Sequence, residues 1–296
     1  MTAVTGRRGP RVARSRSELA ESVDAVRTGT VALVPTMGAL HEGHLSLIRL
    51  AREHADVVVV SIFVNPLQFG PGEDFERYPR AFPADLEACR AEGVDVVFAP
   101  PLEVIYPDEP VVRVSSGTMG ECWEGASRAG HFDGVLTVVL KLFHLVAPDV
   151  AVFGEKDAQQ LAVIRRMVHD LNVPVRIMSG TIVRASDGLA VSSRNAYLSA
   201  SERRSALSLP RALRAGVAAA DAGAEAVRRA SLEVLANEPG LLLDYMTLVE
   251  PDTFAEVSDK HAGSAVLAAA AYAGTTRLID NVRVTLPSGA AEDMEE

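Results

Sequence analysis

Apolar residues in the first 180 positions gather in short runs separated by amphipathic stretches. Such runs occupy residues 30–34, 56–64, 94–99, 150–153 and 175–178, and most are rich in valine and isoleucine. They show little alternation with polar residues, which is typical of strands that are buried on both faces of a parallel sheet. The runs therefore predict buried strands, the first of which should end at Pro35.

Helical spacing fills the stretches between these runs. Apolar residues three and four positions apart predict a helix that starts directly after His44 and further helices at 83–92, 135–146 and 158–171. Strands that alternate with helices of this length imply right-handed β-α-β units. The sequence thus predicts an α/β fold, a Rossmann-like doubly wound parallel sheet, in a domain of residues 1–186. Residues 102–133 show no assignable pattern.

The pattern changes in the last third of the chain. Residues 199–222 and 225–237 are helical and rich in alanine, arginine and leucine, and short strands are expected at 243–249, 264–272 and 277–286. This arrangement predicts a smaller C-terminal α+β domain of residues 187–296. The segment 184–195 that joins the two domains should lie beside the edge of the sheet, where a cleft is expected, and the smaller domain should close over it.

Composition is that of a globular protein with a sizeable core, with 48% hydrophobic and 23% charged residues among 296. A formal net charge of -10 argues against a general surface for nucleic acid or for anionic membranes. No apolar run is long enough to span a bilayer. Only Cys89 and Cys122 are present, so neither a disulfide framework nor a zinc site is indicated, and a cytoplasmic setting is expected. The arginine-rich residues 1–16 and the acidic stretch from Ser288 onward are interpreted as tails.

The first candidate site follows the run at 30–34. A turn that contains Gly38 leads to His41-Glu42-Gly43-His44 and then directly into a helix. A helix N-terminus favours negative charge, and two histidines add donors that can bind a phosphate. Zinc hydrolases need the spacing H-E-x-x-H, which this segment lacks. Two polar residues in an exposed turn are the simpler alternative.

The second candidate is Gly154-Glu155-Lys156-Asp157, between a predicted strand and a predicted helix. Ligands of open α/β sheets bind at this edge. Asp157 alone is explained equally well as a helix cap. A cation at a helix N-terminus opposes the dipole, however, so Lys156 is best explained as a phosphate ligand.

Other polar residues extend these two candidates. Ser192, Ser193 and Arg194 can clamp a phosphate, although an ordinary polar hinge explains them if they stand alone. Asn65, Gln68 and Gln160 offer neutral amides for the hydroxyls and oxygens of a substrate. Trp123 and Glu124 fit a pocket wall or the surface equally well, and His131 is expected in a turn.

Four sequence blocks resemble the signatures of the pantothenate synthetase (pantoate–β-alanine ligase) family. They are Pro35-Thr-Met-Gly-Ala-Leu-His-Glu-Gly-His44, Phe63-Val-Asn-Pro-Leu-Gln-Phe69, Phe153-Gly-Glu-Lys-Asp157 and Ser192-Ser-Arg-Asn195. They occur in the order and with the spacing of that family. The first is similar to the H-x-G-H motif of the adenylyl-transferring Rossmann superfamily.

The resemblance implies a two-step ligase reaction in the synthesis of the coenzyme A precursor pantothenate. Pantoate attacks the α-phosphate of ATP to give pantoyl adenylate and pyrophosphate, and β-alanine then displaces AMP. Mg²⁺ is expected with ATP, its ligands unknown, and a homodimer is implied.

The resemblance also assigns roles to residues. His41 and His44 contact the phosphates, with His44 as proton donor, and Lys156, Ser192, Ser193 and Arg194 hold them. Gln68 and Gln160 bind pantoate, with Gln68 near β-alanine as well and Asn65 close by. The remaining nucleotide contacts are Met37, Gly38, Gly154, Glu155, Asp157, Val183 and Val191.

Three positions depart from the family pattern: Val191 stands where methionine is usual, Ala158 replaces an aromatic residue, and Ala84 reduces an acidic pair beside Asp85. Magnesium is therefore expected to be held mainly by phosphate oxygens and water.

Two other functions share parts of the pattern. A cytidylyltransferase-like enzyme would not require Gln68 and Gln160, and an inactive nucleotide-binding module would not retain both histidines and Lys156.

Overall fold

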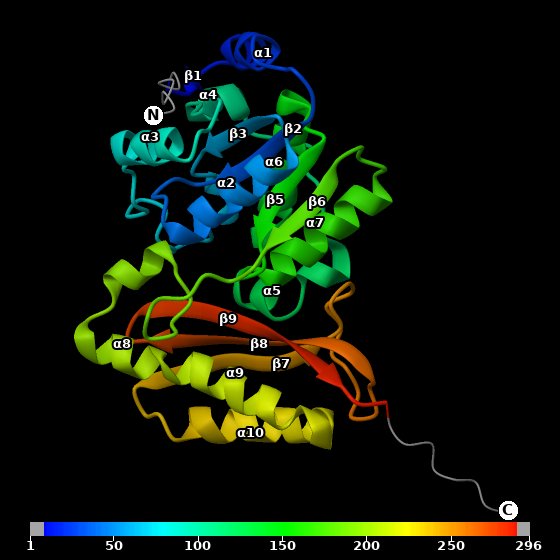
Figure 1. The fold of residues 1–296 in the computed structure, drawn as a ribbon. Helices are drawn as coiled ribbons and strands as arrows, with labels where there is room; N and C mark the ends of the chain where they lie inside the picture. Colours follow the sequence, from blue (N-terminus) through cyan, green and yellow to red (C-terminus); the bar gives the residue numbers. More distant parts are fainter. Residues whose placement is uncertain (1–8, 289–296) are drawn as a thin grey trace, which may run out of the picture. The chain divides into compact units, whose positions relative to one another are not determined.

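The computed structural model describes residues 9–288, which form two compact units (Figure 1). The first contains residues 9–155 and Val163–Thr181, and the second contains Lys156–Ala162 and residues 182–288. The predicted domain boundary between residues 186 and 187 stays a prediction. Most of the predicted acidic tail and the first eight residues of the predicted basic tail lie outside the described residues.

A six-stranded parallel sheet forms the centre of the first unit. Its strands lie in the order β1 (Arg11–Ala13), β4 (Val96–Phe98), β3 (Val57–Ile62), β2 (Val31–Thr36), β5 (Val150–Gly154) and β6 (Arg176–Gly180). The chain runs outward from β2 through β3 to β4 and then returns to start again at β5. This order confirms the predicted doubly wound α/β sheet.

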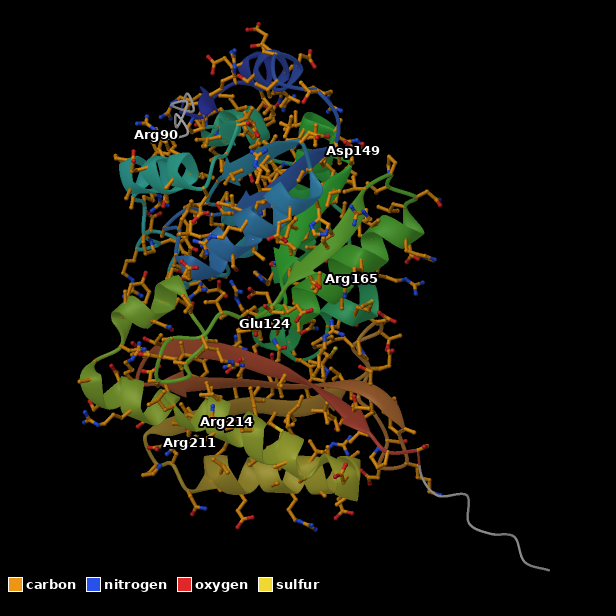
Figure 2. The ribbon with its side chains drawn as sticks, viewed as in Figure 1. Arg90, Glu124, Asp149, Arg165, Arg211 and Arg214 are labelled. Carbon is orange, nitrogen blue, oxygen red and sulfur yellow. The ribbon has the colours of Figure 1, made fainter. Side chains whose placement is uncertain are left out.

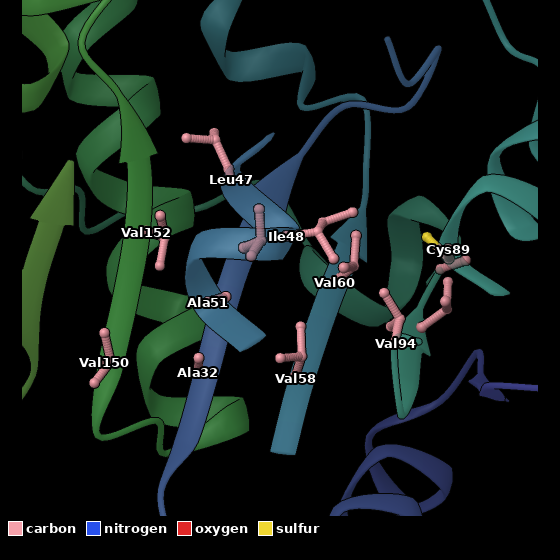
Figure 3. Packing of buried hydrophobic residues seen from close by; sticks show 13 residues of the cluster. Ala32, Leu47, Ile48, Ala51, Val58, Val60, Cys89, Val94, Val150 and Val152 are labelled. Atoms are coloured by element: carbon pink, nitrogen blue, oxygen red, sulfur yellow. The ribbon is translucent and has the colours of Figure 1, made fainter. Parts of the chain in front are cut away.

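Helices cover both faces of this sheet. Helices α2 (Glu42–His54) and α3 (Phe82–Ala91) pack on one face, where Leu47, Ile48 and Ala51 meet the valines of the strands (Figure 3). Neighbouring side chains of a strand point to opposite faces. The other side chains of β2 are covered by α6 (His131–Val146), which packs against α1 (Arg16–Asp24). Burial of two faces explains why the strands lack polar alternation.

Two sequence predictions for this unit were wrong, one at the start of the described chain and one at Pro35. Residues 11–24, expected to begin within a basic tail, instead form the edge strand β1 and helix α1, because Val12 and Ala13 pair with β4 and Ser15 caps α1. Residues 102–133, for which the sequence showed no assignable pattern, contain the short helices α4 (Leu102–Ile105), η2 (Gly117–Gly120) and α5 (Glu124–Ser127). These are too short to produce a periodic pattern.

Pro35 does not end the first strand, contrary to the prediction. Strand β2 continues to Thr36, and Pro35 pairs with Ser61 of β3. The residues of β2 that face β5 are the odd-numbered ones, since the Asp149 amide donates to the Val31 carbonyl. Proline has no N–H, and at position 35 the missing N–H would have pointed toward β5 and not toward β3. Pairing between β2 and β5 accordingly extends no further than Leu33 and Ala151.

The second unit is built on an antiparallel sheet of β7 (Leu241–Val249), β8 (Gly263–Ala273) and β9 (Thr276–Leu286). Helices α9 (Ser208–Ala218) and α10 (Ala224–Ala236) pack on it through Leu209, Leu213 and Leu235. Small side chains of β8, Ala269 and Ala271, lie in the same buried cluster as Leu209 and Leu235. Shorter elements are η3 (Ser193–Tyr197), α8 (Ala200–Ala206) and η4 (Ala220–Ala222). This unit confirms the predicted α+β fold.

Helix α7 (Ala158–Asp170) contributes to both units: its first five residues belong to the second and the remainder to the first. Among residues 9–288, no helix combines the length and apolarity needed to cross a bilayer.

Candidate active site

The strand order of the first unit reverses between β2 and β5. Asp149, labelled in Figure 2, ties the amino ends of these strands together, because its amide donates to the Val31 carbonyl at 2.9 Å and its carboxylate accepts from the Val31 amide at 2.8 Å. At the carboxyl ends Pro35 leaves the strands unpaired. Open α/β sheets bind ligands outside the carboxyl ends of strands at such a reversal. Strand β2 leads from this point into the His41–His44 segment.

The two predicted histidines lie together at the start of α2. Their rings stack with centroids 4.0 Å apart, and the His41 amide donates to Nδ1 of His44 at 3.3 Å. This bond makes Nδ1 an acceptor, so the neutral His44 ring carries its proton on Nε2. A Cβ on Gly43 would lie 3.0 Å from Cε1 of His41, which explains the glycine between the histidines. The pair therefore presents a ring N–H at the amino end of a helix.

The turn before this helix is shaped by a buried carboxylate. Gly38 and Ala39 adopt positive φ angles of 82° and 50°. The amides of Ala39 and Leu40 donate to Asp85 of α3 at 3.0 and 2.7 Å. The sequence predicted that the amino end of the helix and the two histidines would bind a phosphate, and this stays a prediction. Because Asp85 occupies the amides at 39 and 40, contact to an anion falls to the two histidines and the helix end.

Asn65 and Gln68, both predicted as substrate ligands, are brought together by the loop after β3, where η1 (Pro66–Gln68) forms one turn. Nδ2 of Asn65 donates to Oε1 of Gln68 at 3.1 Å and to the Gly134 carbonyl at 3.0 Å. The hydroxyl of Tyr106 donates to Oδ1 of Asn65 at 3.0 Å. Burial raises the pKa of Tyr106 to about 12, so this hydroxyl remains a donor. The buried Asn65 amide thereby fixes the orientation of the Gln68 side chain.

The backbone of Gln68 is held by a second set of residues. Its carbonyl accepts from Nη2 of Arg128 at 3.0 Å and from Nδ1 of His131 at 2.8 Å. Arg128 also forms a bidentate pair with Glu73, at 2.9 and 2.7 Å, and lies 3.5 Å from Glu124, which Figure 2 labels. Glu73 and three side chains from the stretch 124–131 thus come together at the Gln68 turn.

Two members of this cluster, His131 and Glu73, have shifted pKa values. Burial and the neighbouring Arg128 lower the pKa of His131 to about 4, and hydrogen bonds from Arg128 lower the pKa of Glu73 although burial opposes this. His131 is therefore neutral near pH 7. The expectation that it lies in a turn was wrong, because it is the first residue of α6. Glu124 is buried, so its surface alternative is excluded.

The second unit carries the other predicted anion ligands. Lys156 lies in the turn before α7, and its carbonyl accepts from Nδ2 of Asn281 at 2.8 Å. Val183 and Val191 are joined by a backbone hydrogen bond of 2.9 Å. Ser192 caps η3 by accepting from the Arg194 amide at 3.3 Å. These bonds fix the backbone of the segments that present Lys156 and Ser192–Arg194.

Comparison with known proteins identifies the family of this chain. The family model described as pantoate-beta-alanine ligase matches residues 11–283. The chain belongs to the pantoate–β-alanine ligase family. Curated relatives named pantothenate synthetase include that of Thermobifida fusca, 59% identical over 90% of this chain and 94% of the relative, and that of Acidothermus cellulolyticus, 56% identical over 95% and 94%.

Solved structures of ligases of this family share the fold. Pantothenate synthetase of Thermus thermophilus aligns with a TM-score of 0.86 at 46% identity, covering 92% of this chain and 98% of that one. The pantoate–β-alanine ligase of Francisella tularensis, complexed with β-γ ATP and β-alanine, aligns with a TM-score of 0.76 at 33% identity, covering 92% and 97%.

The structure of this ligase-family chain distributes the predicted site residues over both units. His41 pairs with His44, Asn65 with Gln68, and Val183 with Val191. Gly154 and Glu155 belong to the first unit, where Glu155 accepts from Ser179 at 3.0 Å, whereas Lys156 and Asp157 belong to the second. Gln160 is also in the second unit, so its partnership with Gln68 stays a prediction.

Sequence reasoning missed Tyr106, Arg128, Glu73 and Asn281. Each acts on a residue far along the chain, with separations of 41 to 125 positions. Their roles become visible only in the folded structure, where they contact these distant residues.

As for magnesium, no group of three metal-binding side chains occurs in the described part of the chain, and both oxygens of Asp85 already accept hydrogen bonds from backbone amides.

Proposed function

We propose that the chain condenses pantoate with β-alanine through pantoyl adenylate. A carboxylate oxygen of pantoate bonds to the α-phosphorus of ATP while the bond to the bridging oxygen breaks and pyrophosphate leaves. The amine of β-alanine then bonds to the acyl carbon, AMP leaves with the electron pair of the broken carbon–oxygen bond, and the amine loses a proton. The stacked His41–His44 pair at the sheet reversal, in a chain of this family, carries the proposal.

Each residue has a role that its chemistry supports. Charge builds on the phosphates during the first step, and preorganised donors stabilise such charge most effectively. Nε2 of His44 donates to a phosphate oxygen, and the side chains of Lys156, Ser192, Ser193 and Arg194 hold the phosphates. Within the described residues Lys156 forms no ion pair, which leaves its charge for an anion.

Pantoate is bound in this proposal by Gln68 and Gln160. Asn65 orients Gln68 and leaves its Nε2 to donate to a substrate oxygen. Mg²⁺ arrives with ATP, bound by phosphate oxygens and water, and no step is assigned to it.

The setting of the reaction is also a proposal. We assign it to the cytoplasm, where cysteines stay reduced; Cys89 and Cys122 form no disulfide. We assign the protein as a homodimer, which sedimentation equilibrium would show as twice the chain mass of 31.5 kDa.

The experiment that tests the reaction is isotope exchange between pyrophosphate and ATP without β-alanine. Exchange that requires pantoate is expected, since it reports the first step alone. His44→Ala should reduce the exchange rate ~10²–10³-fold. His54→Ala is the matched control, because His54 is an exposed histidine at the other end of α2.

The outcomes separate the alternatives. Exchange without pantoate, or with a phosphorylated acceptor in its place, would indicate a nucleotidyltransferase. Binding of ATP without any exchange would indicate an inactive module. Near-normal exchange in His44→Ala would remove His44 from the mechanism.

A further inference from the structure

The turn that carries Lys156 is fixed from the far end of the chain. The Lys156 carbonyl accepts the hydrogen bond from Nδ2 of Asn281, which lies in β9, 125 positions later. Asn281 is only 6% exposed, so water cannot easily replace this bond. Both residues belong to the second unit.

Asn281 is itself held in one orientation. Its backbone pairs with Ala268 of β8, and its amide donates to Oδ1 of Asp280 at 2.8 Å. Asp280 is 3% exposed and forms a bidentate pair with Arg184, at 2.7 and 2.9 Å. Nη2 of Arg184 also donates to the Asn281 carbonyl at 3.3 Å. Strand pairing and a buried ion pair therefore fix the position of the Asn281 side chain.

The same ion pair reaches the segment that leads to Ser192. Arg184 donates to the Gly188 carbonyl at 3.1 Å and forms a β-bridge with Ala190. Asn195 donates to the Ala190 carbonyl at 2.9 Å from the other side of the Ser192–Arg194 loop. Both anion-binding segments of the second unit are thus anchored to two adjacent residues of β9.

We propose that Asn281 is a positioning residue for Lys156, which it places for phosphate binding through the bond to the Lys156 carbonyl. The inference rests on the proposed role of Lys156. It adds a requirement that lies outside the four sequence blocks: strand β9 must be folded for Lys156 to bind ATP. Asn281 acts only through Lys156 and touches no reacting atom.

The test is a double-mutant cycle between Asn281→Ala and Lys156→Ala, read by pantoate-dependent exchange of pyrophosphate with ATP. Loss of one buried hydrogen bond is expected to lower kcat/KM for ATP about tenfold in Asn281→Ala. The effect should fall mainly on the KM for ATP. In the Lys156→Ala background, Asn281→Ala should have little further effect, because the residue it positions is gone.

Asn237→Ala is the matched control. Asn237 also donates from Nδ2 to a backbone carbonyl at 2.8 Å, that of Glu233, and it belongs to the same unit. It is expected to leave exchange unchanged. Ser231→Ala, which removes a buried bond of 2.9 Å to the Val227 carbonyl, controls for general loss of stability.

Each outcome has one meaning. Equal fold-losses for Asn281→Ala with and without Lys156 would overturn the inference, as would normal kinetics in Asn281→Ala or an equal loss in Ser231→Ala. Those results leave the proposed reaction intact if Lys156→Ala is strongly impaired. Normal exchange in Lys156→Ala would instead remove the proposed role of Lys156, and the inference with it.

Discussion

His131 shows how one residue can link protonation to the shape of the site. Its ring is enclosed beneath the Gln68 turn, where Nδ1 donates to the Gln68 carbonyl and Nε2 lies 3.1 Å from Nη1 of Arg128. A second proton on Nε2 would face the guanidinium. The ring must therefore stay neutral for the cluster to keep its geometry.

This arrangement predicts a loss of stability in mild acid. The folded pKa of about 4 lies below the ordinary value near 6.5, so the unfolded chain binds more protons between these values and stability falls as the pH falls through them. Between pH 7 and pH 5 the contribution of His131 should decrease by about 2 kcal/mol, measurable by urea unfolding. His131→Asn should lack that decrease.

Glu73 does not confound the measurement, because its lowered pKa places its own loss of stabilisation below about pH 4.5. His144→Asn is the control, since His144 is exposed on the same helix, and it should retain the full decrease. An unchanged pH dependence in His131→Asn would contradict the assignment of the buried neutral ring.

At the scale of elements, the backbone of α6 packs directly against the backbone of the η1 turn at Gly134. A Cβ on Gly134 would lie 2.1 Å from the Leu67 carbonyl oxygen and 3.0 Å from the Gln68 amide. Backbone atoms cannot move aside as a flexible side chain can. The glycine therefore sets how closely α6 supports the turn that presents Gln68.

Gly134→Ala is predicted to cost about 1–3 kcal/mol of stability and to raise the KM for pantoate. Gly216→Ala is the matched control, because its Cβ would lie 2.3 Å from Oγ of Ser231 within the second unit. It should lower stability without the same change in KM. An unaltered KM in Gly134→Ala, determined by steady-state kinetics with urea unfolding alongside, would show that the turn tolerates the shift.

The elements also show what a sequence can reveal. The parallel strands, α2 and the α+β pattern follow from local periodicity, and the histidine pair follows from local spacing. Periodicity did not reveal that β2 continues through Pro35. The missing N–H of Pro35 removes a hydrogen bond to β5 only, and the sequence does not show which strand lies on that side. The supports of Gln68 and Lys156 were equally hidden, since Arg128 and Asn281 meet their targets only after the chain has folded.

On the scale of the whole molecule, one helix, α7, is divided between the two units. The first five residues of α7 belong to the second unit, while the rest of α7 belongs to the first. A helix is cooperative, and unfolding one end removes support from the other. The chain therefore cannot lose one unit and leave α7 complete.

We expect a single thermal transition in scanning calorimetry, with calorimetric and van't Hoff enthalpies in agreement. A ligand that binds the folded protein, such as ATP, should shift the whole transition to higher temperature. Two resolved transitions, or a shift confined to one of them, would show that the shared helix does not couple the units.

The contact between Asn281 and Lys156 also has a consequence for how the chain is made. Domains generally begin to fold from the N-terminus during synthesis, which proceeds at about 5–20 residues per second. The 125 positions between these residues thus correspond to a delay of about 6–25 s on the ribosome. The last strand of the parallel sheet, β6, is made early in that interval, and the turn at Lys156 still lacks its anchor after it. A message truncated just before β9 would yield a chain with all four sequence blocks but without the bond from Asn281 that holds the turn at Lys156.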